Sequence, residues 1–179
     1  MNRQPLIDQI PALRRYARAL TGDAWAADDL VQDTLERACS KWRLWLAGSD
    51  LRAWLFTIMH NLFVSQVRHR VRQGDLASPV DLAGLTQEPA APAACVDSAI
   101  DLQRCLLRLP EEQRVVLLLV TLEDLSYAEV ARITGVPTGT VMSRLSRARS
   151  RLQELMEASA ASPARAAAES ATPPLRRLK

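Results

Sequence analysis

Residues 126–152 read SYAEVARITGVPTGTVMSRLSRARSRL, and no other part of the chain indicates a fold so directly. The stretch begins with a serine and a glutamate three residues later, the capping-box pattern that starts a helix. Ala131 is small enough for two helices to approach closely, and Gly135 can adopt the left-handed turn conformation. Val141 then begins the buried stripe of the next helix. The spacing of four and then six residues between these three positions predicts a helix-turn-helix.

The second helix of this motif has an apolar side and a polar side. Val141, Leu145, Ala148 and Leu152 form its predicted core face, while Arg144–Arg151 contains four arginines and no acidic residue. A helix in the DNA major groove needs short polar or cationic groups for base edges and further cations for phosphates. The pattern therefore favours DNA binding over a merely solvated face. The predicted DNA contacts on this helix are Thr138, Thr140, Met142, Ser143, Arg144 and Arg147.

The composition of the 179-residue chain fits helical packing and gives little sign of catalytic chemistry. Hydrophobic residues make up 48 % and aromatic residues 4 %, so Leu, Val, Ile and Ala must do most of the packing. The net charge of +3 does not by itself indicate a nucleic-acid partner. Three cysteines without a C-x-x-C pair and two histidines provide too few closely spaced ligands for a zinc site. No phosphate loop or paired-carboxylate site is evident, so we expect no enzyme activity, metal or cofactor.

Two further features concern where the protein acts. The N-terminus leads into no apolar signal-like segment, and no run of about 18 apolar residues occurs. The cysteine pattern suits reduced thiols. We therefore expect a cytoplasmic protein without membrane insertion.

The N-terminal part shows helical spacing of apolar residues from Leu6 to about Arg72, without strand-like alternation. A first stripe ends at Thr21-Gly22-Asp23, where a glycine stop precedes an aspartate that can cap the next helix. A third helix is expected to begin at Leu51, after a break at residues 47–50. The predicted fold class is all-α, with two small helical domains joined by a flexible linker.

Residues 73–97 differ abruptly in composition from their flanks. They contain three prolines, two glycines, four acidic residues and no Lys or Arg, which predicts a flexible acidic linker. We accordingly expect an N-terminal helical domain at 1–72 and a helix-turn-helix domain at 98–156. Residues 157–179 lack an apolar face and are expected to be a disordered tail.

The third helix, with the sequence LRAWLFTIMHNLFVSQVRHRVR, is apolar on nearly all sides and then becomes basic. Aromatic side chains near a basic helix end can stack on unpaired bases, although Trp54 and Phe56 could also be ordinary core residues. Asn61 interrupts the apolar surface, where an amide needs a partner. The candidate DNA contacts on this helix are Trp54, Asn61, Arg68 and Arg70.

The second helix carries an acidic stripe opposite its predicted core face. Asp29, Gln32, Asp33 and Glu36 stand at i, i+3, i+4 and i+7. DNA phosphates would repel this stripe, so it is not expected to touch DNA. It is either a plain solvated face or a docking surface for a basic protein.

Three motifs together resemble the extracytoplasmic-function (ECF) sigma factors of bacterial RNA polymerase. They are DDLVQDTLERAC at 28–39, LRAWLFTIMHN at 51–61 and LPEEQRVVLLLVTLEDLSYAEVARITGVPTGTVMSRLSRAR at 109–149. The resemblance covers about residues 8–72 and 98–155. It implies a sigma factor that binds core RNA polymerase and directs promoter-specific transcription initiation at minus-10 and minus-35 elements.

The resemblance also implies roles for single residues. In the family, the segment similar to DDLVQDT binds the largest polymerase subunit, and the segment similar to RAWLFTIMHN melts the minus-10 element and captures a flipped base. The second domain reads the minus-35 element. Family members commonly have an anti-sigma factor, which no residue here identifies. The implied polymerase contacts are Asp28, Asp29, Gln32, Asp33 and Glu36.

Three positions depart from the family pattern. Ser65 stands where members often have an acid, Leu51 where they often have Phe, and Met142 where Lys or Arg is common. These departures leave the implied fold and polymerase role intact and concern the promoter contacts.

The alternative is a stand-alone helix-turn-helix regulator that binds operators as a dimer. It predicts tight, specific DNA binding without polymerase, whereas a sigma factor binds DNA weakly until core polymerase is added. The linker length is compatible with a sigma factor, because 25 residues span at most ~80 Å. DNA sites about 20 bp apart are separated by roughly 70 Å.

Overall fold

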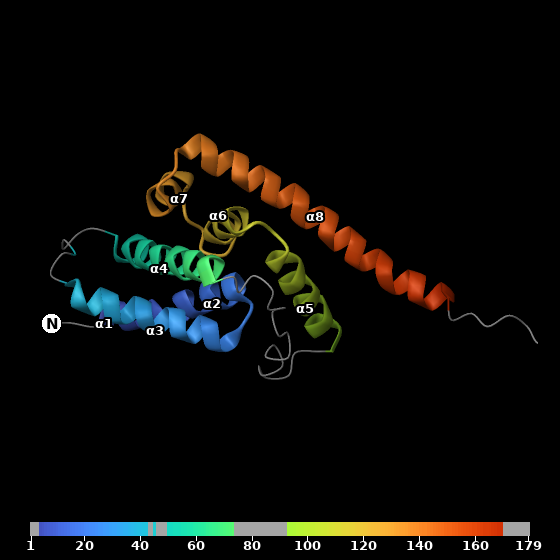
Figure 1. Ribbon diagram of the computed structural model, residues 1–179, viewed down its shortest axis with the longest axis horizontal. Helices are drawn as coiled ribbons and strands as arrows, with labels where there is room; N and C mark the ends of the chain where they lie inside the picture. Colours follow the sequence, from blue (N-terminus) through green and yellow to red (C-terminus); the bar gives the residue numbers. More distant parts are fainter. Residues whose placement is uncertain (1–3, 43–44, 46–49, 74–92, 170–179) are drawn as a thin grey trace, which may run out of the picture.

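The computed structural model describes residues 4–42, 45, 50–73 and 93–169, with side chains described at 4–42, 45, 50–72 and 99–159. These ranges contain α-helices and no strand, which confirms the predicted all-α class (Figure 1). The helices are α1 (Gln4–Ile7), α2 (Ile10–Thr21), α3 (Ala24–Ser40), α4 (Leu51–Gln73), α5 (Ala93–Leu107), α6 (Glu111–Thr121), α7 (Tyr127–Thr134) and α8 (Thr138–Glu169).

Helices α1–α4 form an N-terminal unit whose turns follow the predicted chemistry. Gly22 ends α2 with φ 74°, and its N–H donates to the Arg18 carbonyl at 2.9 Å. Asp23 caps α3 by accepting a hydrogen bond from the Ala26 N–H at 2.6 Å. The stripe expected to start at Leu6 is divided between α1 and α2, because Pro11 lacks an N–H and suits only a first helical turn.

The core of the N-terminal unit is built from α2, α3 and α4. The ring of Tyr16 meets Phe56 edge-on, with 5.2 Å between centroids. Phe56 is therefore a core residue, which is one of the two interpretations that the sequence allowed. Trp54 is half-buried against the same core. Fully buried side chains here are Leu13, Tyr16, Leu20, Leu30, Leu55 and Met59.

Helices α5–α8 form a C-terminal unit that contains the predicted helix-turn-helix. Ser126 and Glu129 make a complete capping box at the start of α7, and Gly135 ends that helix with φ 69°. Val141 at the start of α8 is fully buried. The predicted motif is confirmed in α7 and α8, and α6 packs against both.

Two helices extend beyond their predicted ends. Helix α5 begins at Ala93, inside the predicted linker, and α8 continues to Glu169, past the predicted start of the tail at residue 157. Alanine has the highest helix propensity of all residues, so the Ala-rich sequence after residue 157 can remain helical without an apolar face. The rest of the predicted linker (74–92) and tail (170–179) lies outside the described residues.

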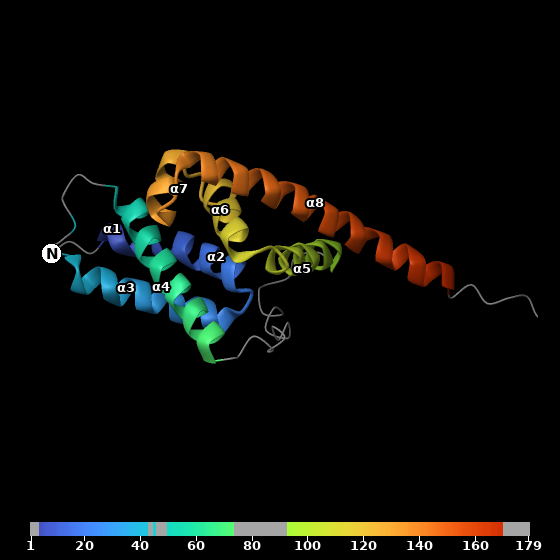
Figure 2. The same cartoon turned by 45° about the horizontal axis from the view of Figure 1, so that its top comes forward.

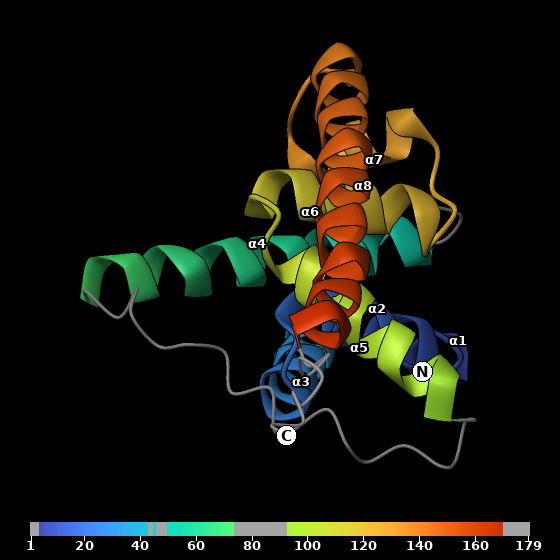
Figure 3. The same cartoon turned by 90° about the vertical axis from the view of Figure 1, so that its right-hand side faces the viewer.

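The two units pack directly against each other, with α2 against α5 and α6, and α4 against α7 (Figure 2). Gln103 of α5 donates a hydrogen bond to the Ala19 carbonyl at 3.1 Å. The Leu107 side chain lies against Gly22, at the end of α2. In Figure 3, α8 runs down the picture and α4 lies crosswise to it. We call this arrangement of the two units the docked state.

The two left-handed glycines provide a test of this docking. Gly22→Ala and Gly135→Ala impose the same backbone strain, about 1–2 kcal/mol each. A Cβ at Gly22 would also collide with the Leu107 side chain, whereas space is open around Gly135. We expect chemical denaturation to show that Gly22→Ala lowers the free energy of unfolding by about 1–3 kcal/mol more than Gly135→Ala.

Equal losses in the two variants would show that Leu107 does not pack against Gly22 in solution. The Gly135→Ala variant is the control, because its position has the same sign of φ and nothing within 4 Å of the added atom.

Candidate protein and nucleic-acid interfaces

The predicted polymerase contacts lie together on the outer side of α3. Asp28, Asp29, Gln32 and Glu36 are exposed and Asp33 is half-buried. The opposite side of the helix is buried in the core of the N-terminal unit. The helix thus separates acid from apolar residues as its sequence spacing predicts. We call these five residues the acidic face.

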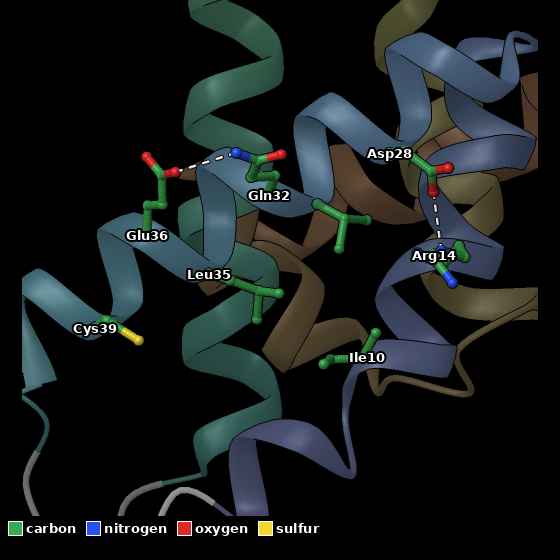
Figure 4. Close-up of a pocket in the computed structure, with 8 residues that line it drawn as sticks. Ile10, Arg14, Asp28, Gln32, Leu35, Glu36 and Cys39 are labelled. Carbon is green, nitrogen blue, oxygen red and sulfur yellow. Dashed lines mark hydrogen bonds and ion pairs between the residues drawn. The ribbon is translucent and has the colours of Figure 1, made fainter.

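The acidic face borders a groove of about 550 Å³ between α2 and α3 (Figure 4). Ile10, Val31 and Leu35 give the groove an apolar floor. Its rim is polar: Arg14 Nε donates to Asp28 Oδ1 at 2.9 Å, and Gln32 Nε2 donates to Glu36 Oε1 at 3.3 Å. An apolar floor with an acidic rim suits a helix that has apolar residues along one side and basic residues beside them.

Sequence reasoning missed the α2 side of this groove. Ile10 and Arg14 come from a different helix, and only the packing of α2 on α3 brings them to the acidic face. Arg14 also neutralises part of the charge of Asp28. The negative charge of the face is therefore concentrated on Asp29, Asp33 and Glu36.

The candidate DNA contacts on α4 do not share one side of the helix. Trp54, Asn61 and Arg68 are spaced by seven residues, so they follow one side with a drift of ~20° per step. Asn61 and Arg68 are exposed, and Trp54 is half-buried. Arg70 is exposed but projects from nearly the opposite side, two residues from Arg68.

Asn61 was singled out because an amide in an apolar stretch needs a partner. The residue is exposed, so water or an external ligand can satisfy its amide. Although its neighbours in the sequence are mostly apolar, α4 leaves this side uncovered. An uncovered amide next to a half-buried tryptophan is free to contact an external ligand.

The candidate DNA contacts at the start of α8 differ in exposure. Thr138, Met142 and Arg147 are exposed, with Met142 at 50 %. Thr140 and Ser143 are half-buried, and Ser143 Oγ donates to the Thr140 carbonyl at 3.0 Å. Half of the predicted set is thus available to a ligand in the docked state.

Arg144 is turned toward the rest of the protein. Its side chain is only 21 % exposed and forms an ion pair with Glu112 of α6. His60 of α4 is near: burial and the charge of Arg144 together lower the pKa of the His60 imidazole. The arginine that was expected to read DNA bases is therefore engaged by an acid of its own unit.

A buried acid joins the two units, and no sequence pattern predicts it. The carboxylate of Glu123, between α6 and α7, is 0 % exposed and accepts hydrogen bonds from Arg15 at 3.0 Å and Arg52 at 2.7 Å. In the sequence, Glu123 is one of two adjacent acids between leucines, a pattern typical of an ordinary loop. Its partners are 108 and 71 residues away along the chain.

Two further searches cover only the described part of the chain. No group of three or more His, Cys, Asp or Glu side chains there could hold a metal ion. None of its helices is both long enough and apolar enough to cross a membrane.

Both units match known protein families. Residues 6–60 match the family model described as the Sigma2 domain of PhyR. Residues 99–152 match the model of Sigma-70, region 4. The two matches coincide with the N-terminal and C-terminal units, respectively.

Similar whole proteins and structures extend this result. The chain is 40 % identical over 154 residues to the ECF RNA polymerase sigma factor EcfG of Rhodopseudomonas palustris (strain TIE-1), covering 86 % of this chain and 84 % of that protein. It is 35 % identical over 144 residues to the ECF sigma factor SigM of Mycobacterium tuberculosis, covering 80 % and 71 %. The sigma factor RpoE of Bartonella quintana, solved with the anti-sigma factor NepR, matches with a TM-score of 0.74 and 39 % identity over 87 % of this chain and 96 % of that chain. The chain therefore belongs to the extracytoplasmic-function family of RNA polymerase sigma factors.

Proposed function

We propose that this sigma factor binds core RNA polymerase through the acidic face of α3 and promoter DNA through α4 and the start of α8. As a member of its family, the chain directs promoter-specific transcription initiation. The observation that carries the assignment of surfaces is the separation of charge. Acids line the groove between α2 and α3, and arginines gather at the end of α4 and along α8.

The acidic face suits a protein partner better than DNA. Phosphates would be repelled by Asp29, Asp33 and Glu36, whereas a basic helix would be attracted to them. The apolar floor of Ile10 and Leu35 adds a contact that a nucleic-acid backbone cannot use. A helix of the largest polymerase subunit is the proposed occupant.

The α4 residues suit an unpaired base of the minus-10 element. Trp54 offers a partly exposed ring for stacking, Asn61 an uncovered amide for a base edge, and Arg68 a cation for the backbone, all along one side. Arg70, on the other side, is limited to a phosphate contact. The assignments of Trp54, Asn61 and Arg68 rest on their shared side of α4.

The start of α8 suits the minus-35 element in the major groove. Thr138, Met142 and Arg147 are exposed there, and Thr140 and Ser143 are half-buried. Arg144 is paired with Glu112 of α6 within the same unit, so it must leave that pair to reach a base edge. We assign phosphate contacts to Arg149 and Arg151, which are exposed further along α8.

An anti-sigma factor is a further proposed partner, because the similar Bartonella quintana sigma factor was solved with one. We also infer a non-enzymatic, cytoplasmic role, since the proposed partners are core polymerase and chromosomal DNA. No observation favours the stand-alone regulator. Both family matches and the curated relatives favour a sigma factor.

Reversing charge on the acidic face should impair polymerase binding. The double variant Asp29→Arg/Gln32→Ala is expected to lose about tenfold or more in affinity for core polymerase, because it places a cation against a basic partner. Run-off transcription with purified core polymerase should fall accordingly. Asp101→Arg, an equal charge change at an exposed position on α5, is the control and should transcribe like the parent. Normal transcription by the double variant would remove the acidic face from the polymerase interface.

Arginines along α8 should divide into two classes. Arg144→Ala is expected to change the order of preference among minus-35 sequences, since a lost base contact changes discrimination by about 1–3 kcal/mol at one position. Arg149→Ala should weaken all promoters equally and reduce the salt dependence by about one phosphate contact. Promoter-library transcription and binding at several salt concentrations measure the two effects. A uniform loss in Arg144→Ala would reassign that residue to the backbone.

A further inference from the structure

Within the described part of the chain, the Glu123 carboxylate accepts its hydrogen bonds from side chains of the other unit. Glu123 belongs to the C-terminal unit, whereas Arg15 lies on α2 and Arg52 on α4 of the N-terminal unit. Arg15 Nη2 is 3.0 Å from Oε1 and Arg52 Nη2 is 2.7 Å from Oε2, so each carboxylate oxygen has its own guanidinium. The carboxylate is 0 % exposed, but the two arginine side chains are 54 % and 36 % exposed.

The same arginines reach the end of α6. Arg52 Nη2 donates to the Glu123 carbonyl at 2.7 Å, and Arg15 Nη2 donates to the Leu122 carbonyl at 3.4 Å. Carbonyl groups at a helix C-terminus lack helical partners and carry the negative end of the helix dipole. Arg52 is further steadied by the ring of Phe56, 5.8 Å from the guanidinium carbon. The contact thus combines a buried ion pair, main-chain bonds and a favourable dipole.

This cluster is specific to the docked state. A buried carboxylate is tolerated only while it is paired, and removal of one partner leaves an uncompensated charge. When the units separate, water can solvate all three side chains. The energetic effect of changing one of them is therefore confined to the contact between the units.

The docked state keeps the proposed DNA-binding helices together. Helix α4 packs against α7, and His60 of α4 is close enough to Arg144 of α8 for the two to interact electrostatically. Promoter elements about 20 bp apart are separated by roughly 70 Å along the duplex. Helices in contact cannot occupy two sites at that separation, so promoter binding requires the units to part.

We propose that Glu123, Arg15 and Arg52 form an ionic latch that holds the free sigma factor in a docked state unable to engage both promoter elements. The proposal rests on the proposed promoter contacts of α4 and α8. The latch lowers the fraction of free molecules that can bind promoter DNA. Core polymerase acquires promoter specificity when the latch of its bound sigma factor opens. Weak DNA binding by the free chain is then a consequence of these three residues.

The test uses the full-length chain with Glu123→Gln and Arg15→Gln as separate variants. Glu123→Gln keeps the volume and removes the negative charge, leaving two guanidinium groups without a counter-ion. Arg15→Gln removes one cation from a half-exposed position on the other unit, so it reports on the latch even where Glu123→Gln weakens folding. Arg104→Gln is the control: it removes an arginine of similar exposure, 53 %, from a pair with Asp101 within α5.

Two measurements are made without polymerase at one fixed salt concentration. Small-angle X-ray scattering gives the radius of gyration, and a promoter duplex that supports run-off transcription gives the affinity for DNA. We expect both latch variants to increase the radius of gyration and to bind the duplex about tenfold more tightly, since apparent affinity rises with the competent fraction. Arg104→Gln should match the parent in both.

An unchanged radius of gyration in both variants overturns the latch, whatever transcription shows. A larger radius without tighter DNA binding overturns its inhibitory role. The proposed polymerase interface is tested separately: normal run-off transcription by the Asp29→Arg/Gln32→Ala variant would contradict it. The two ideas therefore fail in different experiments.

Discussion

The carboxylate of Glu123 can leave water only because Arg15 and Arg52 reach it from the other helical unit. This contact fixes the turn between α6 and α7 against α2 and α4, and so positions α7 on α4. The hydroxyl of Tyr16 shares this environment, where burial, reinforced by the charge of Glu123, raises the pKa of the phenol. A site with so few polar partners is sensitive to any change of charge. Together with the packing of α2 on α5 and α6, it positions the surfaces of the C-terminal unit relative to the N-terminal unit.

Local chemistry explains why much of the fold could be predicted from the sequence. Gly22, Gly135 and the Ser126–Glu129 box each act within a few residues, so their effect is visible in the sequence itself. The helical spacing of apolar residues likewise places the acidic face opposite the core without reference to other elements. The helix-turn-helix and the acidic face were accessible for this reason.

Features that depend on distant segments of the chain could not be predicted from the sequence. The groove beside the acidic face needs Ile10 and Arg14 from α2, and the burial of Glu123 needs an arginine 108 residues away. The exposure of Asn61 is likewise decided by what packs on α4, and its apolar neighbours in the sequence do not reveal it. Helix α8 continues past residue 157 because alanine has a high intrinsic helix propensity. The apolar pattern used to predict the end of the helix does not take this propensity into account. Tertiary packing and propensity thus account for the differences between expectation and structure.

The two kinds of surface are not equally available in the docked state, and this difference suggests an order of events. All residues lining the acidic groove belong to α2 and α3, so docking leaves the groove open. The helices proposed to bind the promoter, in contrast, belong to different units that docking holds together, with α4 packed against α7. Under the proposed roles, polymerase can bind while the units are docked, whereas the two promoter elements cannot both be engaged until the units separate. A ligand shifts such an equilibrium only by binding the open state more tightly. Polymerase must therefore make contacts with the separated C-terminal unit in addition to those with the acidic face.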